Sequence, residues 1–174
     1  DSFRLAAQVI RSGFRPSMMI AIWRGGAPVG VAVQELLAYK GIETDHISIR
    51  TSSYEGIDGR SSEIRIHGLN YLIKKVTHDD RLLIVDDVFD TGSTIDAVIR
   101  RLEEKARLNT PHDIRVAVPY FKPTRNLTNR VPDYYIHETE KWLKYPHSLE
   151  GLKATDVAEH RPHLFQIMEP FLEP

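Results

Sequence analysis

The feature that most constrains the fold is the segment 82–94, which reads Leu-Leu-Ile-Val-Asp-Asp-Val-Phe-Asp-Thr-Gly-Ser-Thr. Its four leading apolar residues are typical of a buried strand. Apolar side chains then recur at helical spacing from Ile95 to Ala106, which predicts a helix that begins directly after the glycine. A buried strand that turns tightly into a helix is a building unit of α/β proteins.

Strands and helices alternate along the rest of the chain. Helical spacing of apolar residues predicts further helices over residues 5–10, 28–37 and 69–76. Short apolar or alternating runs predict strands over residues 18–23, 46–50, 114–118 and 133–136. We expect Pro119 to end its strand, and the polar, aperiodic stretch 51–63 to form a loop. This order predicts the α/β class, with a mainly parallel twisted sheet flanked by helices.

Length and charge exclude several kinds of protein. The chain has 174 residues, which predicts a single domain over 1–174, with a core over about 1–119 and a small C-terminal hood over about 120–174. Lys and Arg number 23 against 24 Asp and Glu, so no broad basic surface for nucleic acid is expected. Cysteine is absent, which excludes a thiolate metal site and a cysteine nucleophile. The longest apolar run, 18–23, is too short to cross a membrane, and we expect a cytoplasmic protein.

The chemistry is expected beyond the carboxyl ends of the parallel strands, where three loops qualify: 24–26, 51–63 and 86–94. The last of these has two parts. Residues 90–94 combine a permissive glycine, hydroxyl donors and the start of a helix, which suits a phosphate. Asp86 and Asp87 place two carboxylates beside it, suited to a diol or to Mg²⁺. The alternative is an acidic turn in which Asp90 or Thr91 caps the helix.

The segment 82–94 resembles the 5-phosphoribosyl-1-pyrophosphate (PRPP) binding motif of type I phosphoribosyltransferases, and the chain from about Met18 to Pro146 resembles their purine branch. The resemblance implies that Asp86 and Asp87 bind the ribose hydroxyls and Mg²⁺. It also implies that Asp90 handles the proton at purine N7, as general base or acid. It assigns the 5-phosphate to the loop formed by Asp90, Thr91, Gly92, Ser93 and Thr94.

The same resemblance assigns the pyrophosphate to two further loops. Arg24 and Gly25 match the loop after the first strand, where the family often has a cis peptide, here between Trp23 and Arg24. Ser53 and Tyr54 match a Ser-Tyr pair of a catalytic loop that closes over the site and excludes water. Arg60 and Arg65 could add positive charge. The alternatives are a simple Gly-Gly turn and a polar surface loop.

The purine side of the site is assigned to the last third of the chain. Lys122 matches a lysine that binds the purine 6-oxo group, Trp142 matches an aromatic that stacks on the base, and the backbone near Leu143 reads its edge. The alternatives are a solvated lysine and a core tryptophan. The chain departs from its relatives after Pro146, where an acidic residue is missing that Glu150 could replace. His160 and His163 are expected to lie on the surface rather than to bind metal.

Taken together, the resemblance implies an enzyme, a PRPP-dependent glycosyltransferase of purine salvage. Its reaction would be the Mg²⁺-dependent transfer of 5-phosphoribosyl from PRPP to N9 of hypoxanthine, guanine or xanthine. The expected partners are PRPP, a free purine base and further copies of the chain, as a homodimer or homotetramer. Two alternatives stay open: a nucleotide- and RNA-binding regulator on the same fold, and a pyrimidine or orotate phosphoribosyltransferase.

Overall fold

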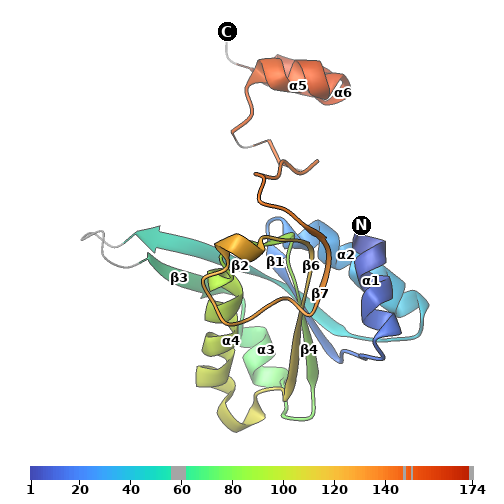
Figure 1. The fold of residues 1–174 in the computed structure, drawn as a ribbon, viewed down its shortest axis with the longest axis vertical. Helices are drawn as coiled ribbons and strands as arrows, with labels where there is room; N and C mark the ends of the chain where they lie inside the picture. The colour runs from blue at the N-terminus through green and yellow to red at the C-terminus, as the bar shows by residue number, and fades with distance from the viewer. Residues whose placement is uncertain (56–61, 147, 150, 173–174) are drawn as a thin grey trace. The chain divides into compact units, whose positions relative to one another are not determined.

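The computed structural model describes residues 1–55, 62–146, 148–149 and 151–172 (Figure 1). The chain divides into two compact units, Asp1–Lys141 and Trp142–Pro174. The first unit contains a seven-stranded sheet in the order β3-β2-β1-β4-β6-β5, with β7 also paired to β6. Only the pairing of β3 with β2 is antiparallel; the other pairings in the described sheet are parallel.

Three strands form the middle of the sheet: β1 (Met18–Trp23), β4 (Arg81–Val85) and β6 (Asp113–Phe121). The strands around them are β2 (Asp45–Glu55), β3 (Ser62–His67), β5 (Val88–Phe89) and β7 (Tyr134–Glu138). The first and fourth strands are buried along almost their whole length, as expected of parallel strands covered on both faces.

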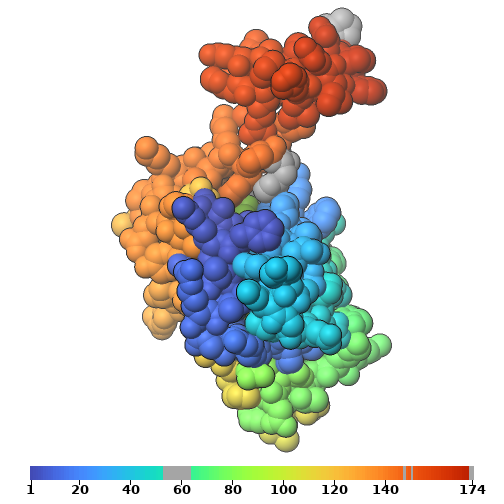
Figure 2. Space-filling model, turned by 90° about the vertical axis from the view of Figure 1, so that its right-hand side faces the viewer, coloured from blue at the N-terminus to red at the C-terminus, as the bar shows by residue number. Residues whose placement is uncertain are grey.

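Helices cover both faces of the sheet. On one side α1 (Ser2–Arg11) and α2 (Gly26–Tyr39) lie against each other, and Figure 2 views the molecule from this side. On the other side lie α3 (Asn70–Lys75) and α4 (Ser93–Ala106). Alternate residues of β4 divide between two hydrophobic cores, with Leu82 and Ile84 in the core of α3 and α4, and Leu83 and Val85 in that of α1 and α2. The prediction of a mainly parallel sheet flanked by helices is confirmed.

The prediction of a loop over 51–63 is wrong at both ends, where 51–55 and 62–63 belong to strands. β2 continues to Glu55, and β3 returns from Ser62, paired in a register from Arg50↔His67 to Glu55↔Ser62. Residues 51–55 are polar and show no apolar alternation, so their sequence does not mark a strand, although the antiparallel register continues through them. Residues 56–61, which include Arg60, lie outside the described part of the chain.

The expected end of a strand at Pro119 is also wrong, because β6 runs on to Phe121. Proline has no N–H to donate to a sheet. The register with β7 accommodates this by passing from Val118↔Tyr135 to Tyr120↔His137, so that Pro119 has no partner in it. β6 therefore stays paired with β7 beyond the proline, and Lys122 follows directly after its end.

The second unit contains α5 (Ala154–His160), α6 (Pro162–Met168) and a short 3-10 helix, η3 (Glu169–Phe171). The Arg161 guanidinium donates to the carbonyl oxygens of Tyr145, Pro146 and Ser148, each at 3.1 Å, and so ties the first part of the unit to its helices. The unit begins after Lys141, so that β7, within the expected hood of 120–174, belongs to the sheet of the first unit. None of the described helices has the length and apolar character needed to cross a bilayer.

Candidate active site

Two loops meet at the carboxyl ends of β1 and β4, which are parallel neighbours in the sheet. From β1 the chain passes to β2 on one side, whereas β4 and β6 lie on the other side, so the strand order reverses here. Ligands of open α/β sheets bind at such a switch point. A Cβ at Gly25 would overlap the carboxylate of Asp87, and one at Gly26 would lie 2.8 Å from the Val85 carbonyl oxygen. Only glycine at these two positions lets the loop after β1 lie this close to the residues at the end of β4.

The adjacent acids Asp86 and Asp87 occupy the gap between two strands. The chain leaves β4 at Val85 and pairs with β6 again as β5. Within the gap, the Asp86 N–H donates to the Ala117 carbonyl at 3.2 Å and the Asp87 N–H donates to Asp86 Oδ1 at 2.9 Å. Burial, and next the neighbouring charge of Asp87, raise the pKa of Asp86 well above its usual range. Two carboxylates in this position favour a cation or hydroxyl partner.

The predicted phosphate loop closes with a glycine in the left-handed region, Gly92, at φ +79°. A Cβ there would lie 2.6 Å from Thr128 Oγ1 and 2.7 Å from the Phe89 ring, so a side chain is excluded by both conformation and space. The Ser93 N–H donates to Thr91 Oγ1 at 3.3 Å, and α4 follows at once. The free N–H groups and positive dipole end of a long helix suit an anion at this loop.

Asp90 forms two ion pairs. Lys122 Nζ lies 3.0 Å from its Oδ2, and Arg125 Nε lies 2.7 Å from its Oδ1. Lys122 is only 2% exposed, so the alternative of a solvated lysine is wrong. Arg125 was not predicted to belong to the site. It follows Lys122 in the 3-10 turn η2 (Pro123–Arg125), and only this turn brings it back to Asp90.

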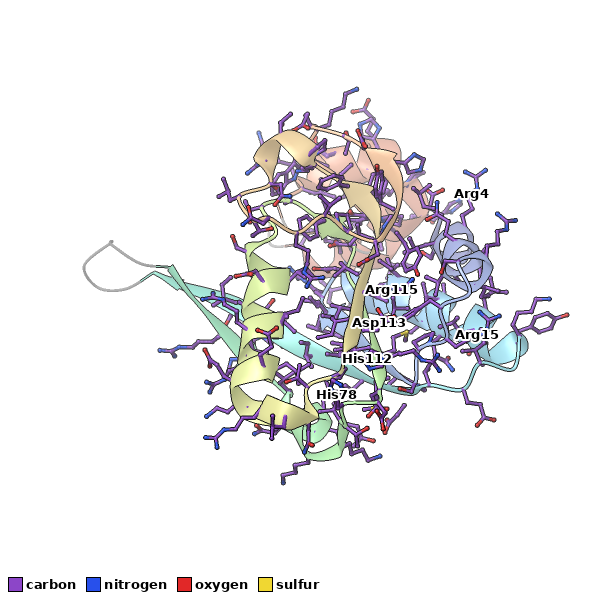
Figure 3. All side chains as sticks on the ribbon, turned by 60° about the horizontal axis from the view of Figure 1, so that its bottom comes forward. Arg4, Arg15, His78, His112, Asp113 and Arg115 are labelled. Carbon is purple, nitrogen blue, oxygen red and sulfur yellow. The ribbon has the colours of Figure 1, made fainter. Side chains whose placement is uncertain are left out.

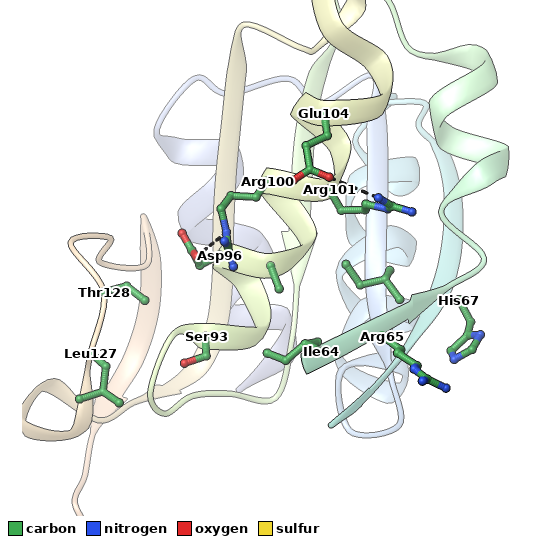
Figure 4. Close-up of a pocket in the computed structure, with 12 residues that line it drawn as sticks. Ile64, Arg65, His67, Ser93, Asp96, Arg100, Arg101, Glu104, Leu127 and Thr128 are labelled. Carbon is green, nitrogen blue, oxygen red and sulfur yellow. Dashed lines mark hydrogen bonds and ion pairs between the residues drawn. The ribbon is translucent and has the colours of Figure 1, made fainter. Parts of the chain in front are cut away.

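The residues predicted to bind pyrophosphate lie on three different segments of the first unit. The peptide bond between Trp23 and Arg24 is cis, as the resemblance implies. Ser53 and Tyr54 lie in β2, and their contact with pyrophosphate stays a prediction. Arg65 lies on β3 and lines a cavity of about 940 Å³ between β3 and α4, together with Arg100 and Ser93 (Figure 4). Ser93 thus belongs to both the phosphate loop and this cavity.

The residues predicted for purine divide between the two units. Lys122 lies in the first, whereas Trp142 and Leu143 begin the second, so their contact with the base stays a prediction. Trp142 is 78% exposed and is therefore not a core residue. Glu150 lies outside the described residues. His160 and His163 are exposed, as expected. Among the described side chains, no group of three or more His, Asp or Glu could hold a metal ion.

Comparison with known proteins decides the family. The sequence pattern of the family described as "Phosphoribosyl transferase domain" matches residues 2–150, most of the chain. The chain belongs to this family. A purine phosphoribosyltransferase from Pyrococcus horikoshii is 31% identical in sequence, with a TM-score of 0.67 over 87% of this chain and 90% of that one. These two findings confirm the prediction of a type I phosphoribosyltransferase of the purine branch, and with it that of a glycosyltransferase enzyme.

Two further solved structures share the phosphoribosyltransferase fold at lower identity. A hypothetical protein from Neisseria gonorrhoeae with bound ppGpp is 20% identical, with a TM-score of 0.68 over 86% of this chain and 84% of that one. A hypoxanthine phosphoribosyltransferase from Staphylococcus aureus is also 20% identical, with a TM-score of 0.58 over 79% and 70%. Among curated protein sequences, none matches this phosphoribosyltransferase significantly.

Proposed function

We propose that this phosphoribosyltransferase transfers the 5-phosphoribosyl group from PRPP to N9 of a 6-oxopurine, with Mg²⁺, and releases pyrophosphate. The observation that carries the proposal is the meeting of three elements at one end of the sheet. The loop at Gly25 touches Asp87, and the phosphate loop at Gly92 follows Asp86 and Asp87 after a two-residue strand. Sites for pyrophosphate, ribose and 5-phosphate then lie in the order in which PRPP carries these groups.

The acids suit a magnesium ion bound together with its substrate. Mg²⁺ is usually held by one or two carboxylates, with substrate oxygens and water completing its octahedron. Asp86 and Asp87 offer such a pair. Burial, and next the charge of Asp87, raise the pKa of Asp86, and a bound cation would offset both effects. A bound Mg²⁺ would neutralise the charge that develops on the departing pyrophosphate.

The protein's own groups would act by position and electrostatics. The N–H groups of the phosphate loop would bind the 5-phosphate, and the N–H groups near Arg24 and Gly25 would bind pyrophosphate. Asp87 and Asp86 would accept hydrogen bonds from the ribose hydroxyls and so orient the anomeric carbon toward the purine. Asp90 would accept or return the proton at purine N7 as N9 forms its bond to the ribose.

Selection of the base would rest on Lys122 and Trp142. The Lys122 ammonium is a donor only, so it suits the 6-oxo oxygen of hypoxanthine, guanine or xanthine and not the 6-amino group of adenine. Trp142, which is largely exposed, would stack on the purine ring. The purine phosphoribosyltransferase from Pyrococcus horikoshii supports the purine class, and the buried lysine beside Asp90 supports the 6-oxo preference.

The test is to incubate the protein with PRPP, Mg²⁺ and each of hypoxanthine, guanine, xanthine, adenine, uracil and orotate, and to measure nucleotide and pyrophosphate formed. We expect product from at least one 6-oxopurine and loss of product when Mg²⁺ is chelated. Product from orotate or uracil alone, or from no base, would overturn the proposal.

A matched pair of variants locates the activity. Asp87→Asn removes a carboxylate of the proposed ribose site and should abolish most product. Asp113→Asn is the control, because Asp113 begins β6 at the opposite end of the sheet, where it pairs with Arg115 at 2.9 Å (Figure 3). It should leave product formation unchanged. A cytoplasmic location and assembly as a homodimer or homotetramer stay predictions.

A further inference from the structure

Each carboxylate oxygen of Asp90 has its own cation. Lys122 Nζ lies 3.0 Å from Oδ2, and Arg125 Nε lies 2.7 Å from Oδ1. The Lys122 contact is a charge-assisted hydrogen bond, a strong kind of contact. The Arg125 contact is an ion pair without hydrogen-bond geometry, on an Asp90 Oδ1 that is buried and has no hydrogen-bond partner. Rotation of the Asp90 carboxylate about its Cβ–Cγ bond would break the hydrogen bond from Lys122 or separate Oδ1 from the Arg125 guanidinium. The orientation of Asp90 therefore depends on both cations.

Main-chain hydrogen bonds fasten the segment that carries both cations. The Lys122 N–H donates to the Phe89 carbonyl at 2.9 Å, and the Leu127 N–H donates to the Thr91 carbonyl at 2.9 Å. These two bonds join the segment to the residues on either side of Asp90. Between them, the Arg125 N–H donates to the Lys122 carbonyl at 3.2 Å and closes the turn. These hydrogen bonds fix the position of the main chain from which the Arg125 side chain extends. An ion pair between two long surface side chains lacks such a fixed base.

The two cations differ in whether they also bind the substrate. Lys122 is buried and, under the proposed function, donates to the 6-oxo group of the purine. Its ammonium must then share its donors between the substrate and Asp90. The Arg125 side chain is half exposed, and the proposed function assigns it no contact with the base. It is the cation that can keep its ion pair with Asp90 after the purine has bound.

We propose that Arg125 is a positioning residue: its guanidinium fixes the Asp90 carboxylate in the orientation that meets the purine N7 proton, while Lys122 turns to the 6-oxo group. This inference rests on the proposed function, since it concerns the same site and the same base. A displacement of about 1 Å at a reacting group can cost about 100-fold in rate. Loss of one of two holders of Asp90 should cost about 10-fold.

The kinetic test compares three variants with the base that the wild type uses best. In Arg125→Gln we expect kcat to fall about 10-fold, with the KM values for PRPP and purine within about two-fold of the wild type. Arg125→Lys restores a cation and should recover most of the loss. Arg115→Gln is the matched control, because Arg115 Nε makes the same kind of pair with Asp113 Oδ1, at 2.9 Å, at the opposite end of the sheet (Figure 3). It should match the wild type.

Two kinetic results would overturn the proposal. If kcat of Arg125→Gln stays within two-fold of the wild type, Arg125 does not position Asp90. If KM for PRPP rises while kcat is unchanged, Arg125 binds the substrate instead.

A crystal structure of the free Arg125→Gln chain gives a readout that needs no activity. We expect the Asp90 carboxylate to rotate from its present orientation. An Asp90 that keeps the same rotamer without Arg125 would refute the inference. If the wild type transfers ribose to none of the bases, the proposed function fails, and this structure still decides whether Arg125 orients Asp90.

Discussion

Gly25→Ala should separate folding from catalysis in this chain. Gly25 has φ −66° and ψ −33°, a conformation that alanine adopts without strain. The added Cβ would overlap only the carboxylate of Asp87, which is the end of a side chain and can rotate away. Alanine is a somewhat poorer residue than glycine before a helix, but it restricts the unfolded chain by about 0.4–1 kcal/mol. The free energy of unfolding should therefore change by less than about 1 kcal/mol.

The effect on catalysis should be much larger. A rotated Asp87 would no longer accept the hydrogen bond from ribose, and a hydrogen bond to a charged group is worth about 1.5–3 kcal/mol. Since about 1.4 kcal/mol is a tenfold change in rate, kcat/KM for PRPP should fall about 10- to 150-fold. Initial rates at varied PRPP and urea unfolding of the same preparations measure the two quantities.

Gly26→Ala is the matched control for this prediction. Its Cβ would lie 2.8 Å from the Asp86 Cα and 2.8 Å from the Val85 carbonyl oxygen, which are backbone atoms inside the sheet and cannot rotate away. Overpacking of this kind costs about 1–3 kcal/mol of stability. The reasoning is refuted if Gly25→Ala keeps the wild-type kcat/KM, or if it loses as much stability as Gly26→Ala.

Three further predictions follow from single side chains. Asp90→Asn should keep PRPP binding, measured by calorimetry, and lose most turnover; full turnover would refute the proton role of Asp90. Trp142→Ala should raise KM for the purine and leave the melting temperature unchanged, because the side chain is exposed; an unchanged KM would contradict stacking. Although partial burial opposes the shift, hydrogen bonds from Ser17 and Thr77 lower the pKa of Asp80. A carboxyl whose pKa is lowered by folding stabilises the fold above its pKa in the unfolded chain, about 3.9. This stabilisation is lost as the pH falls. Asp80→Asn should therefore lower the free energy of unfolding, measured with urea at pH 7, by about 1 kcal/mol. The difference between wild type and variant should disappear below about pH 4, and a difference independent of pH would contradict this.

The sequence predicts best what is decided locally. The buried strand β4, the two acids, the glycine turn and α4 follow one another within a short segment, and each has its own local pattern. The helices of the first unit are found for the same reason, since a face packed on a sheet must be apolar.

What the sequence does not predict depends on residues far apart. Arg125 reaches Asp90 only because β6 pairs with β5 and then turns through η2, and no pattern around Arg125 marks this contact. The far end of the β2–β3 hairpin is missed because residues 51–55 have no apolar alternation, although their main-chain register continues. The course of β6 past Pro119 is missed because the proline falls at a position where the register needs no partner.

The gap between β4 and β5 has a consequence for redesigning the enzyme. Asp86 and Asp87 fill it, while Val85 and Val88 on either side are paired to residues of the same strand, Ala117 and Tyr120. One inserted residue would turn Phe89 from the core toward the opposite face of the sheet, because side chains alternate along a strand. A library at this position can therefore exchange the two side chains without changing the register of β5, but it tolerates neither insertion nor deletion. Any new ligand chemistry must be made by these two residues.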